Sequence, residues 1–242
     1  MRILEAKELS VETNGKLVVN KVSLHVDTGE IILLFGPNGS GKTSFTMALL
    51  GHPNYKIVGG KIYFYGNDIT AYSLEERISL GLTAAFQFAP ELKGIKLGEL
   101  AREIAERHCV SEDTLNELAK ILQIGYLLDR YVNVGFSGGE RKRVEIFLTA
   151  LQSPKFVVFD EPDSGVDRDS VVLISKAIEK MFELGLKGAL IITHTGFLTK
   201  YLEASRAYVM INRRIVCEGP AEIIKDHIIK YGFNMCVMKR SR

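Results

Sequence analysis

Cysteine is scarce in this 242-residue sequence, which holds only Cys109, Cys217 and Cys236. The three are odd in number, far apart and in no C-x-x-C spacing, so they disfavour both a disulfide framework and a structural zinc site. We expect reduced cysteines that serve mostly as packing residues.

An excess of charge is also missing, because 31 basic and 29 acidic residues leave a net charge of +2. This balance gives no reason to expect a nucleic-acid partner. No apolar run approaches the ~20 residues needed to cross a bilayer, and the first residues lack the apolar segment of a secretion signal. We therefore expect a cytoplasmic protein without direct membrane insertion, in which any membrane role belongs to a separate subunit.

Hydrophobic residues, by contrast, make up 46% of the chain, enough for a substantial core. They alternate with polar residues over 3–11 and 17–26, around the turn Asn14-Gly15, which predicts an antiparallel β layer. A further turn is expected at Gly59-Gly60, with a strand over 61–65.

The pattern changes between residues 87 and 137, where apolar residues recur three or four positions apart over 97–108 and 111–122. This spacing predicts a helical insert. After residue 137, strands and helices alternate as they do in a parallel, doubly wound sheet. The fold class expected is therefore α/β.

A glycine-rich loop lies between the apolar run 31–35 and a helical run that starts at Phe45. Its spacing is the G-x-x-x-x-G-K-[ST] pattern, in which backbone N–H groups and the positive end of a helix surround phosphate groups. We expect Lys42 to reach the outer phosphates and Thr43 to ligate Mg²⁺. The phosphate-binding residues predicted are Gly36, Pro37, Asn38, Gly39, Ser40, Gly41, Lys42, Thr43 and Ser44.

Two adjacent carboxylates, Asp160 and Glu161, follow the apolar run 156–159. An apolar strand that ends in Asp-Glu is often only a strand running into a solvated turn. In a chain with a phosphate-binding loop, however, this arrangement is typical of a Walker B strand. We expect Asp160 to bind Mg²⁺ and Glu161 to act as general base toward the attacking water.

His194 follows the apolar run 189–193 in the same way, at the sheet edge where open α/β sheets bind ligands. We expect it to hydrogen-bond the γ-phosphate. The other four histidines lie in no comparable context and are interpreted as surface or cap residues; they are His25, His52, His108 and His227.

A second glycine-rich turn, Ser137-Gly138-Gly139-Glu140, opens another helix and again offers backbone N–H groups to an anion. Taken on its own, such a turn is more often a helix N-cap without a ligand. If the second phosphate site of one chain faces another copy of the chain, the two sites can bind the same nucleotide from opposite sides. We therefore expect the nucleotide to lie between two protomers related by a two-fold axis.

These motifs together resemble those of an ABC-type ATPase, in the family's order and over nearly the whole chain. They are the P-loop 36–43, the Q-loop residue Gln87, the signature Ser137-Gly138-Gly139-Glu140, the Walker B pair Asp160-Glu161, the D-loop 164–167 and the switch His194. The resemblance implies a RecA-like P-loop core with an N-terminal antiparallel β layer and a helical subdomain. It implies one domain over 1–242, with 1–88 and 151–242 as catalytic core and 89–150 as helical subdomain carrying the signature.

Within that family the sequence is most similar to SufC, the ATPase family of the Suf iron–sulfur cluster assembly machinery. The similarity rests on Gly51-His52-Pro53, Ala85-Phe86-Gln87, the run 133–140 and the run 160–165. Phe136 and Glu140 are the most telling, because transporter subunits more often have Leu and Gln there.

This resemblance implies ATP and Mg²⁺ as ligands, with Gln87 joining Thr43 and Asp160 at the metal, and a transient ATP-dependent homodimer. Lys42, Glu161 and His194 are the catalytic residues it implies, and Ser137, Gly138, Gly139 and Glu140 close the site from the opposite protomer. The partners implied are SufB- and SufD-like scaffold proteins, docking where Gln87 meets the helical insert. One departure is that the stretch 11–15 has no aromatic residue to stack on adenine.

Two other functions remain open at this point. A nucleotide-binding subunit of an ABC membrane transporter has the same catalytic parts and a different partner. A non-hydrolysing, ATP-gated clamp or scaffold belongs to another class, but it has no need for the general base Glu161.

Overall fold

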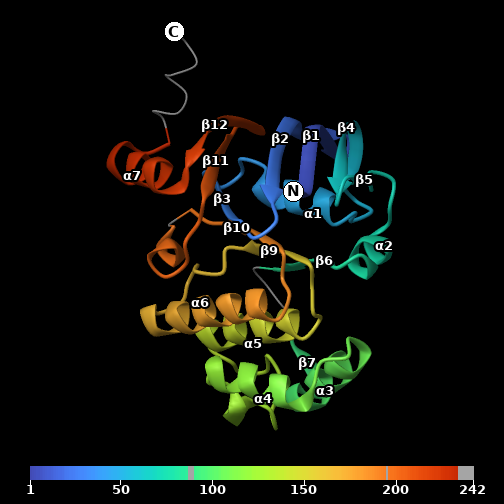
Figure 1. Cartoon of the computed structure of the whole chain (residues 1–242), viewed down its shortest axis with the longest axis vertical. Helices are drawn as coiled ribbons and strands as arrows, with labels where there is room; N and C mark the ends of the chain where they lie inside the picture. The colour runs from blue at the N-terminus through green and yellow to red at the C-terminus, as the bar shows by residue number, and fades with distance from the viewer. Residues whose placement is uncertain (87–89, 195, 234–242) are drawn as a thin grey trace.

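The computed structural model describes residues 1–86, 90–194 and 196–233. A β layer lies at one end of the molecule, a central sheet in the middle and a helical region at the other end (Figure 1). The expected N-terminal β layer, α/β core and helical region are therefore all present.

The β layer is a four-stranded antiparallel sheet in the order β2-β1-β4-β5. Its first two strands pair around the predicted Asn14-Gly15 turn, from Arg2↔Asp27 to Thr13↔Lys16. The strands are β1 (Arg2–Thr13), β2 (Lys16–Asp27), β4 (Lys56–Phe64) and β5 (Asn67–Asp68).

The central sheet has the order β12-β11-β3-β10-β9-β6, and its five strands other than β12 are parallel. Residues of β3 are buried on both sides: Ile32 and Leu34 face the β layer, and Leu33 faces the helices. The strands are β3 (Ile31–Phe35), β6 (Leu82–Ala85), β9 (Phe156–Asp160), β10 (Gly188–Ile192), β11 (Arg206–Ile211) and β12 (Arg214–Pro220).

Helices α5 and α6 lie on the face of the sheet away from the β layer, whereas α1 packs on the side of the β layer (Figure 1). The predicted helical insert is present as α3 and α4. A small two-stranded sheet, β7 (Leu92–Lys96) with β8 (Tyr131–Val132), accompanies it and was not expected from the helical spacing. The helices are α1 (Lys42–Leu49), α2 (Leu74–Ser79), α3 (Leu97–Arg107), α4 (Glu112–Ile121), α5 (Gly138–Ala150), α6 (Arg168–Glu183) and α7 (Ala221–Tyr231). Among the described residues, no helix is long and apolar enough to cross a bilayer.

The turn predicted at Gly59-Gly60 is wrong, because both glycines lie inside β4. The register between β1 and β4 shifts between Lys7 and Ser10, so the strands are bulged there. Gly60 has φ +80°, and a Cβ at this position would lie 2.3 Å from the Lys7 carbonyl oxygen. Glycine is needed at this position because the two strands approach each other closely there. The residues next to Gly60 in the sequence do not reveal this requirement.

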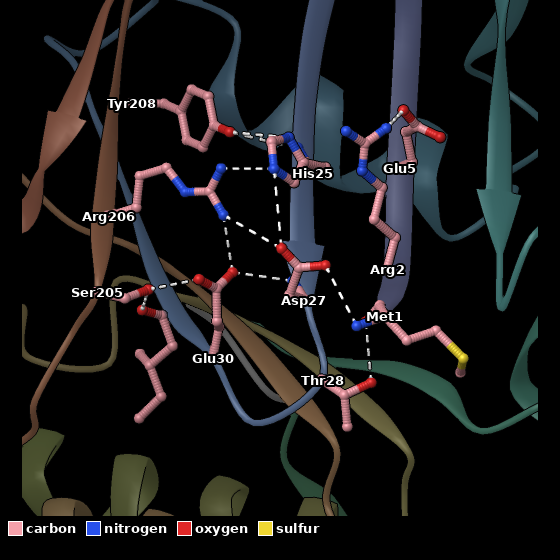
Figure 2. A network of polar contacts seen from close by, with 11 residues as sticks. Met1, Arg2, Glu5, His25, Asp27, Thr28, Glu30, Ser205, Arg206 and Tyr208 are labelled. Carbon is pink, nitrogen blue, oxygen red and sulfur yellow. Dashed lines mark hydrogen bonds and ion pairs between the residues drawn. The ribbon is translucent and has the colours of Figure 1, made fainter.

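Two other expectations about single side chains also fail. Cys109 is exposed rather than packed, and its φ is +55°. His25 is not a surface or cap residue, because its imidazole lies in a polar network between the β layer and β11 (Figure 2). Cys236 lies outside the described residues.

Arg206 is the centre of this network and joins the two sheets (Figure 2). Its guanidinium contacts His25 Nε2 and donates to Glu30 Oε2 at 2.9 Å. Burial and the neighbouring Arg206 and Arg2 charges lower the pKa of His25, although Asp27 and Glu30 act in the opposite direction. The folded protein therefore favours the neutral imidazole, which accepts the hydrogen bond from Arg206.

This lowered pKa predicts a pH-dependent part of the stability. In the unfolded chain, His25 binds a proton near its ordinary pKa of about 6.5, whereas in the folded chain it binds the proton only at lower pH. The contribution of neutral His25 to the free energy of unfolding is therefore fully present above pH 6.5, and it is lost as the pH drops toward the pKa of the folded state. We expect His25→Gln, whose amide oxygen lies where Nε2 does and can still accept from Arg206, to narrow the Tm difference between pH 7.5 and 5.5 by about 1–3 °C. His108→Gln, at the exposed end of α3, is the control. An unchanged Tm difference in His25→Gln contradicts the prediction.

Candidate nucleotide-binding site

The predicted phosphate-binding loop connects the buried strand β3 to helix α1. Gly41 precedes the helix with φ +106°, and a Cβ on it would lie 2.6 Å from the Val18 carbonyl oxygen. A Cβ on Gly36 would lie 2.2 Å from the Met210 carbonyl oxygen. The loop glycines are therefore required both by the turn and by the packing of β2 and β11 against it.

Lys42 is only 6% exposed and has its ammonium group inside the loop. Its Nζ donates to the carbonyl oxygens of Gly36 at 2.7 Å and Pro37 at 3.1 Å. Burial lowers the pKa of this lysine, while the charges of Glu161 and Asp160 raise it. The loop thus holds a positive charge beside the first turn of α1, where free N–H groups also favour an anion.

Thr43 and Asp160 meet beside this loop. The Asp160 carboxylate, which is 5% exposed at the end of β9, is close enough to the Thr43 side chain for the two to interact. Burial raises the pKa of Asp160, and so does the Glu161 charge, whereas Thr43 and the two lysines Lys42 and Lys142 lower it. A hydroxyl and one carboxylate suit Mg²⁺, which takes its other ligands from water and phosphate. Within the described ranges, no group of three or more His, Cys, Asp or Glu side chains is placed to hold a metal ion.

Glu161 and His194 lie at the ends of neighbouring parallel strands. Glu161 Oε1 is 3.4 Å from His194 Nδ1, and the glutamate is 9% exposed while the histidine ring is 41% exposed. Glu161 has φ +52°, a conformation that is uncommon for a residue other than glycine, and its N–H donates to Ile192 O at 2.9 Å. β9 and β10 therefore bring together two side chains that are 33 positions apart in the sequence.

Asp163 is a residue of this region that the sequence interpretation missed as a functional group. Its buried carboxylate accepts from Thr193 Oγ1 at 3.0 Å and from the Phe197 N–H at 3.0 Å. It thereby fixes the segment after β10 that carries His194. Its signal in the sequence was only its position three residues after Asp160.

Helix α5 supplies two further buried charges that were not predicted. Lys142 donates to Phe86 O at 3.1 Å and pairs with Glu145 at 3.7 Å. Burial raises the pKa of Glu145 to about 7 despite the lysine. The helix that begins at the signature is thus bonded to the residue before Gln87. Gln87 itself, the predicted Q-loop ligand, lies outside the described residues.

The signature residues form the N-terminus of α5. Ser137 Oγ accepts from the Glu140 N–H at 3.3 Å, and Glu140 Oε2 accepts from the Ser137 N–H at 2.6 Å, which is a capping box. A Cβ on Gly138 would lie 3.3 Å from Gly165 O, so the signature packs against the predicted D-loop.

A cleft of about 390 Å³ opens over the phosphate-binding loop. Its lining residues are Val18, Asn38, Gly39, Gly41, Lys42, Thr43, Ser44, Glu161 and Arg213. The structure thus brings most of the predicted loop together with the predicted base Glu161. None of the residues found to line this cleft comes from the signature.

A glycine-rich loop between a parallel strand and a helix, with an acidic strand end beside it, defines the class of P-loop nucleotide-binding proteins.

The family model described as ABC transporter matches residues 19–164. A probable ABC transporter ATP-binding protein of Streptococcus pyogenes is 36% identical over 233 residues, covering 92% of this chain and 91% of that protein. A probable ATP-dependent transporter, ycf16, of Cyanophora paradoxa is 34% identical, covering 95% and 93%. The ADP conformation of MJ1267, an ATP-binding cassette of an ABC transporter, superposes with a TM-score of 0.78 at 26% identity, covering 96% of each chain.

The chain therefore belongs to the ABC transporter family, as an ATP-binding cassette subunit that binds and hydrolyses ATP.

Proposed function

We propose that this ATPase drives iron–sulfur cluster assembly through SufB- and SufD-like scaffold proteins. The observation that carries the proposal is the signature, Phe136-Ser137-Gly138-Gly139-Glu140, which has the Phe and Glu of the SufC family. Phe136 is buried beneath the Arg130 guanidinium, 4.9 Å from the ring centre. Glu140 accepts from Tyr126 Oη at 2.6 Å, and this hydrogen bond, with those from Ser137, lowers its pKa. Both residues are therefore integral to the signature helix.

The proposed chemistry follows from the cleft. Lys42 and the loop N–H groups bind the phosphates of ATP, and Glu161 accepts a proton from the water that attacks the terminal phosphorus. His194 donates to the terminal phosphate and orients Glu161 through their 3.4 Å contact. Thr43, Asp160 and Gln87 are the residues proposed to hold Mg²⁺, which neutralises phosphate charge when bound.

A second copy completes the site in this proposal. Ser137, Gly138, Gly139 and Glu140 line no part of the cleft in the described residues of their own chain, whereas the N-terminus of α5 offers N–H groups suited to a phosphate. Two chains related by a two-fold axis place each signature over the partner's loop. Residues 89–150 act in this proposal as the helical subdomain that carries the signature toward the partner, and residues 1–88 and 151–242 as the catalytic core.

An apolar groove beside the catalytic residues supports the proposed docking site. It has a volume of about 530 Å³ and runs between α1, α2 and β6. Met47, Leu74, Ile78 and Phe86 line it together with Thr43 and Asp160, and none of the residues found to line it comes from the helical insert. A scaffold partner seated there contacts both the residue before Gln87 and the groups proposed to bind Mg²⁺, so ATP binding and scaffold shape are coupled.

This site predicts the effect of a charge in the groove. Ile78 is 39% exposed on α2, and Ile78→Glu is expected to abolish co-purification of SufB- and SufD-like proteins co-expressed with the tagged chain, because the carboxylate would be desolvated in the interface. Leu184→Glu, on a similarly exposed residue at the end of α6, is the control and retains the partners. Mass spectrometry of the proteins that co-purify with the tagged chain identifies its partners. Scaffold proteins among them support the proposed role in cluster assembly, and a polytopic membrane subunit in their place contradicts that role.

The second candidate is the ATP-binding subunit of a membrane transporter. The relatives from Streptococcus pyogenes and Cyanophora paradoxa favour it, since both are described as transporter proteins. Capture of the membrane subunit in the experiment above is its expected result.

A further inference from the structure

We propose that Arg213 supplies the stacking surface for the adenine base of the bound nucleotide. This inference rests on the proposed nucleotide site and explains how the chain holds a base without the aromatic residue that was missing from residues 11–15.

Arg213 lies in the turn between β11 and β12, and its backbone is fixed against the phosphate-binding loop. Its N–H donates to Ser40 O at 2.9 Å, and its carbonyl oxygen accepts from the Asn20 N–H at 2.8 Å. A Cβ built on Gly41 would lie 3.7 Å from Arg213 Cα. The turn is thus bonded to both the loop and β2, and the side chain starts from a rigid position.

The lining of the cleft leaves few groups for a base. In the proposed site, the loop residues and the start of α1 bind the phosphates, and Glu161 accepts a proton from the attacking water. Val18 and Arg213 are the two lining residues that remain. No aromatic side chain is among those found to line the cleft, so the base meets one aliphatic and one cationic side chain.

A guanidinium group suits this position. It is planar and weakly hydrated, and it stacks on aromatic rings. The neighbouring Arg214 is already engaged, because its Nη2 and Nε lie 2.8 and 3.0 Å from the Asn20 amide oxygen, with that amide oriented to accept both. Within the described residues no hydrogen bond or ion pair engages the guanidinium of Arg213. It is therefore available to the base.

Calorimetric titration with ADP and with tripolyphosphate separates the base from the phosphates. Arg213→Ala is expected to raise the Kd for ADP about 5- to 20-fold and to leave the Kd for tripolyphosphate unchanged. Arg213→Tyr restores a stacking surface without charge and is expected to bind ADP as the wild type does, whereas Arg213→Lys keeps the charge and is expected to resemble Arg213→Ala. Arg214→Ala is the control with wild-type affinity for both ligands.

Equal weakening of ADP and tripolyphosphate in Arg213→Ala overturns the inference, since it assigns Arg213 to the phosphates. Unchanged ADP affinity overturns it as well. Lys42→Ala tests the proposed nucleotide site independently of Arg213. If Lys42→Ala loses ADP binding, the site is assigned correctly even when the inference about Arg213 fails. If Lys42→Ala binds ADP normally, both the site and the inference are rejected. Melting curves of each variant distinguish a loss of ADP affinity from misfolding, and Arg213→Tyr provides a second substitution at the same position for this check.

Discussion

Glu161→Gln is expected to bind ATP and to lose turnover by about 10²- to 10⁴-fold, because the amide has the shape of the carboxylate but cannot accept the proton of the attacking water. The unusual backbone of Glu161 is fixed by its N–H bond to Ile192 O at 2.9 Å, which the substitution leaves in place. Phosphate release at saturating ATP is the measurement.

The same variant tests the proposed dimer. Without hydrolysis the ATP-bound state persists, so two chains closed around two nucleotides should accumulate and be detected by light scattering after size-exclusion chromatography. Glu106→Gln, an exposed glutamate on α3, is the control for a lost surface charge and should hydrolyse ATP normally. Full-rate hydrolysis by Glu161→Gln removes this residue as general base, and a monomer in saturating ATP rejects the shared site.

Lys42→Ala is expected to weaken ADP binding at least about 10- to 100-fold. Hydrogen bonds to charged groups contribute about 1.5–3 kcal/mol each, and about 1.4 kcal/mol corresponds to a factor of ten in Kd. The substitution also leaves Asp160 and Glu161 next to the phosphates without the nearest positive charge, since both carboxylates interact with Lys42 in the folded chain. Calorimetry with ADP measures the effect.

The folded state must be checked separately for this substitution, because Lys42 donates two hydrogen bonds to the loop, to Gly36 O and Pro37 O. Lys42→Met keeps the aliphatic stem in its buried position and should lose ADP affinity to the same degree with a smaller change in Tm. Lys176→Ala, an exposed lysine on α6, should bind ADP normally. Unchanged ADP affinity in both Lys42 variants contradicts the assignment of the loop.

Relations between distant segments explain where prediction from sequence failed. The glycines of β4 were interpreted as a turn because Gly-Gly is common in turns, yet they are required by the carbonyl of Lys7 on the neighbouring strand. His25 was assigned to the surface because its partner Arg206 is 181 positions away. Asp163 gave a weak signal for the same reason, since its partners Thr193 and Phe197 follow a different strand.

The sequence by itself determined the elements whose cause is local. The loop around Lys42, the strand before it and the helix after it follow from glycine spacing and apolar runs, and the start of α5 follows from the turn Ser137-Gly138-Gly139-Glu140. The order of these motifs also identified the family, because each motif is a short contiguous stretch. Only the tertiary structure decided which side chains meet. Parallel pairing of β9 and β10 sets Glu161 beside His194, and packing of the β11–β12 turn on the phosphate-binding loop places Arg213 in the cleft, since contacts between chain segments depend on how the whole sheet is assembled.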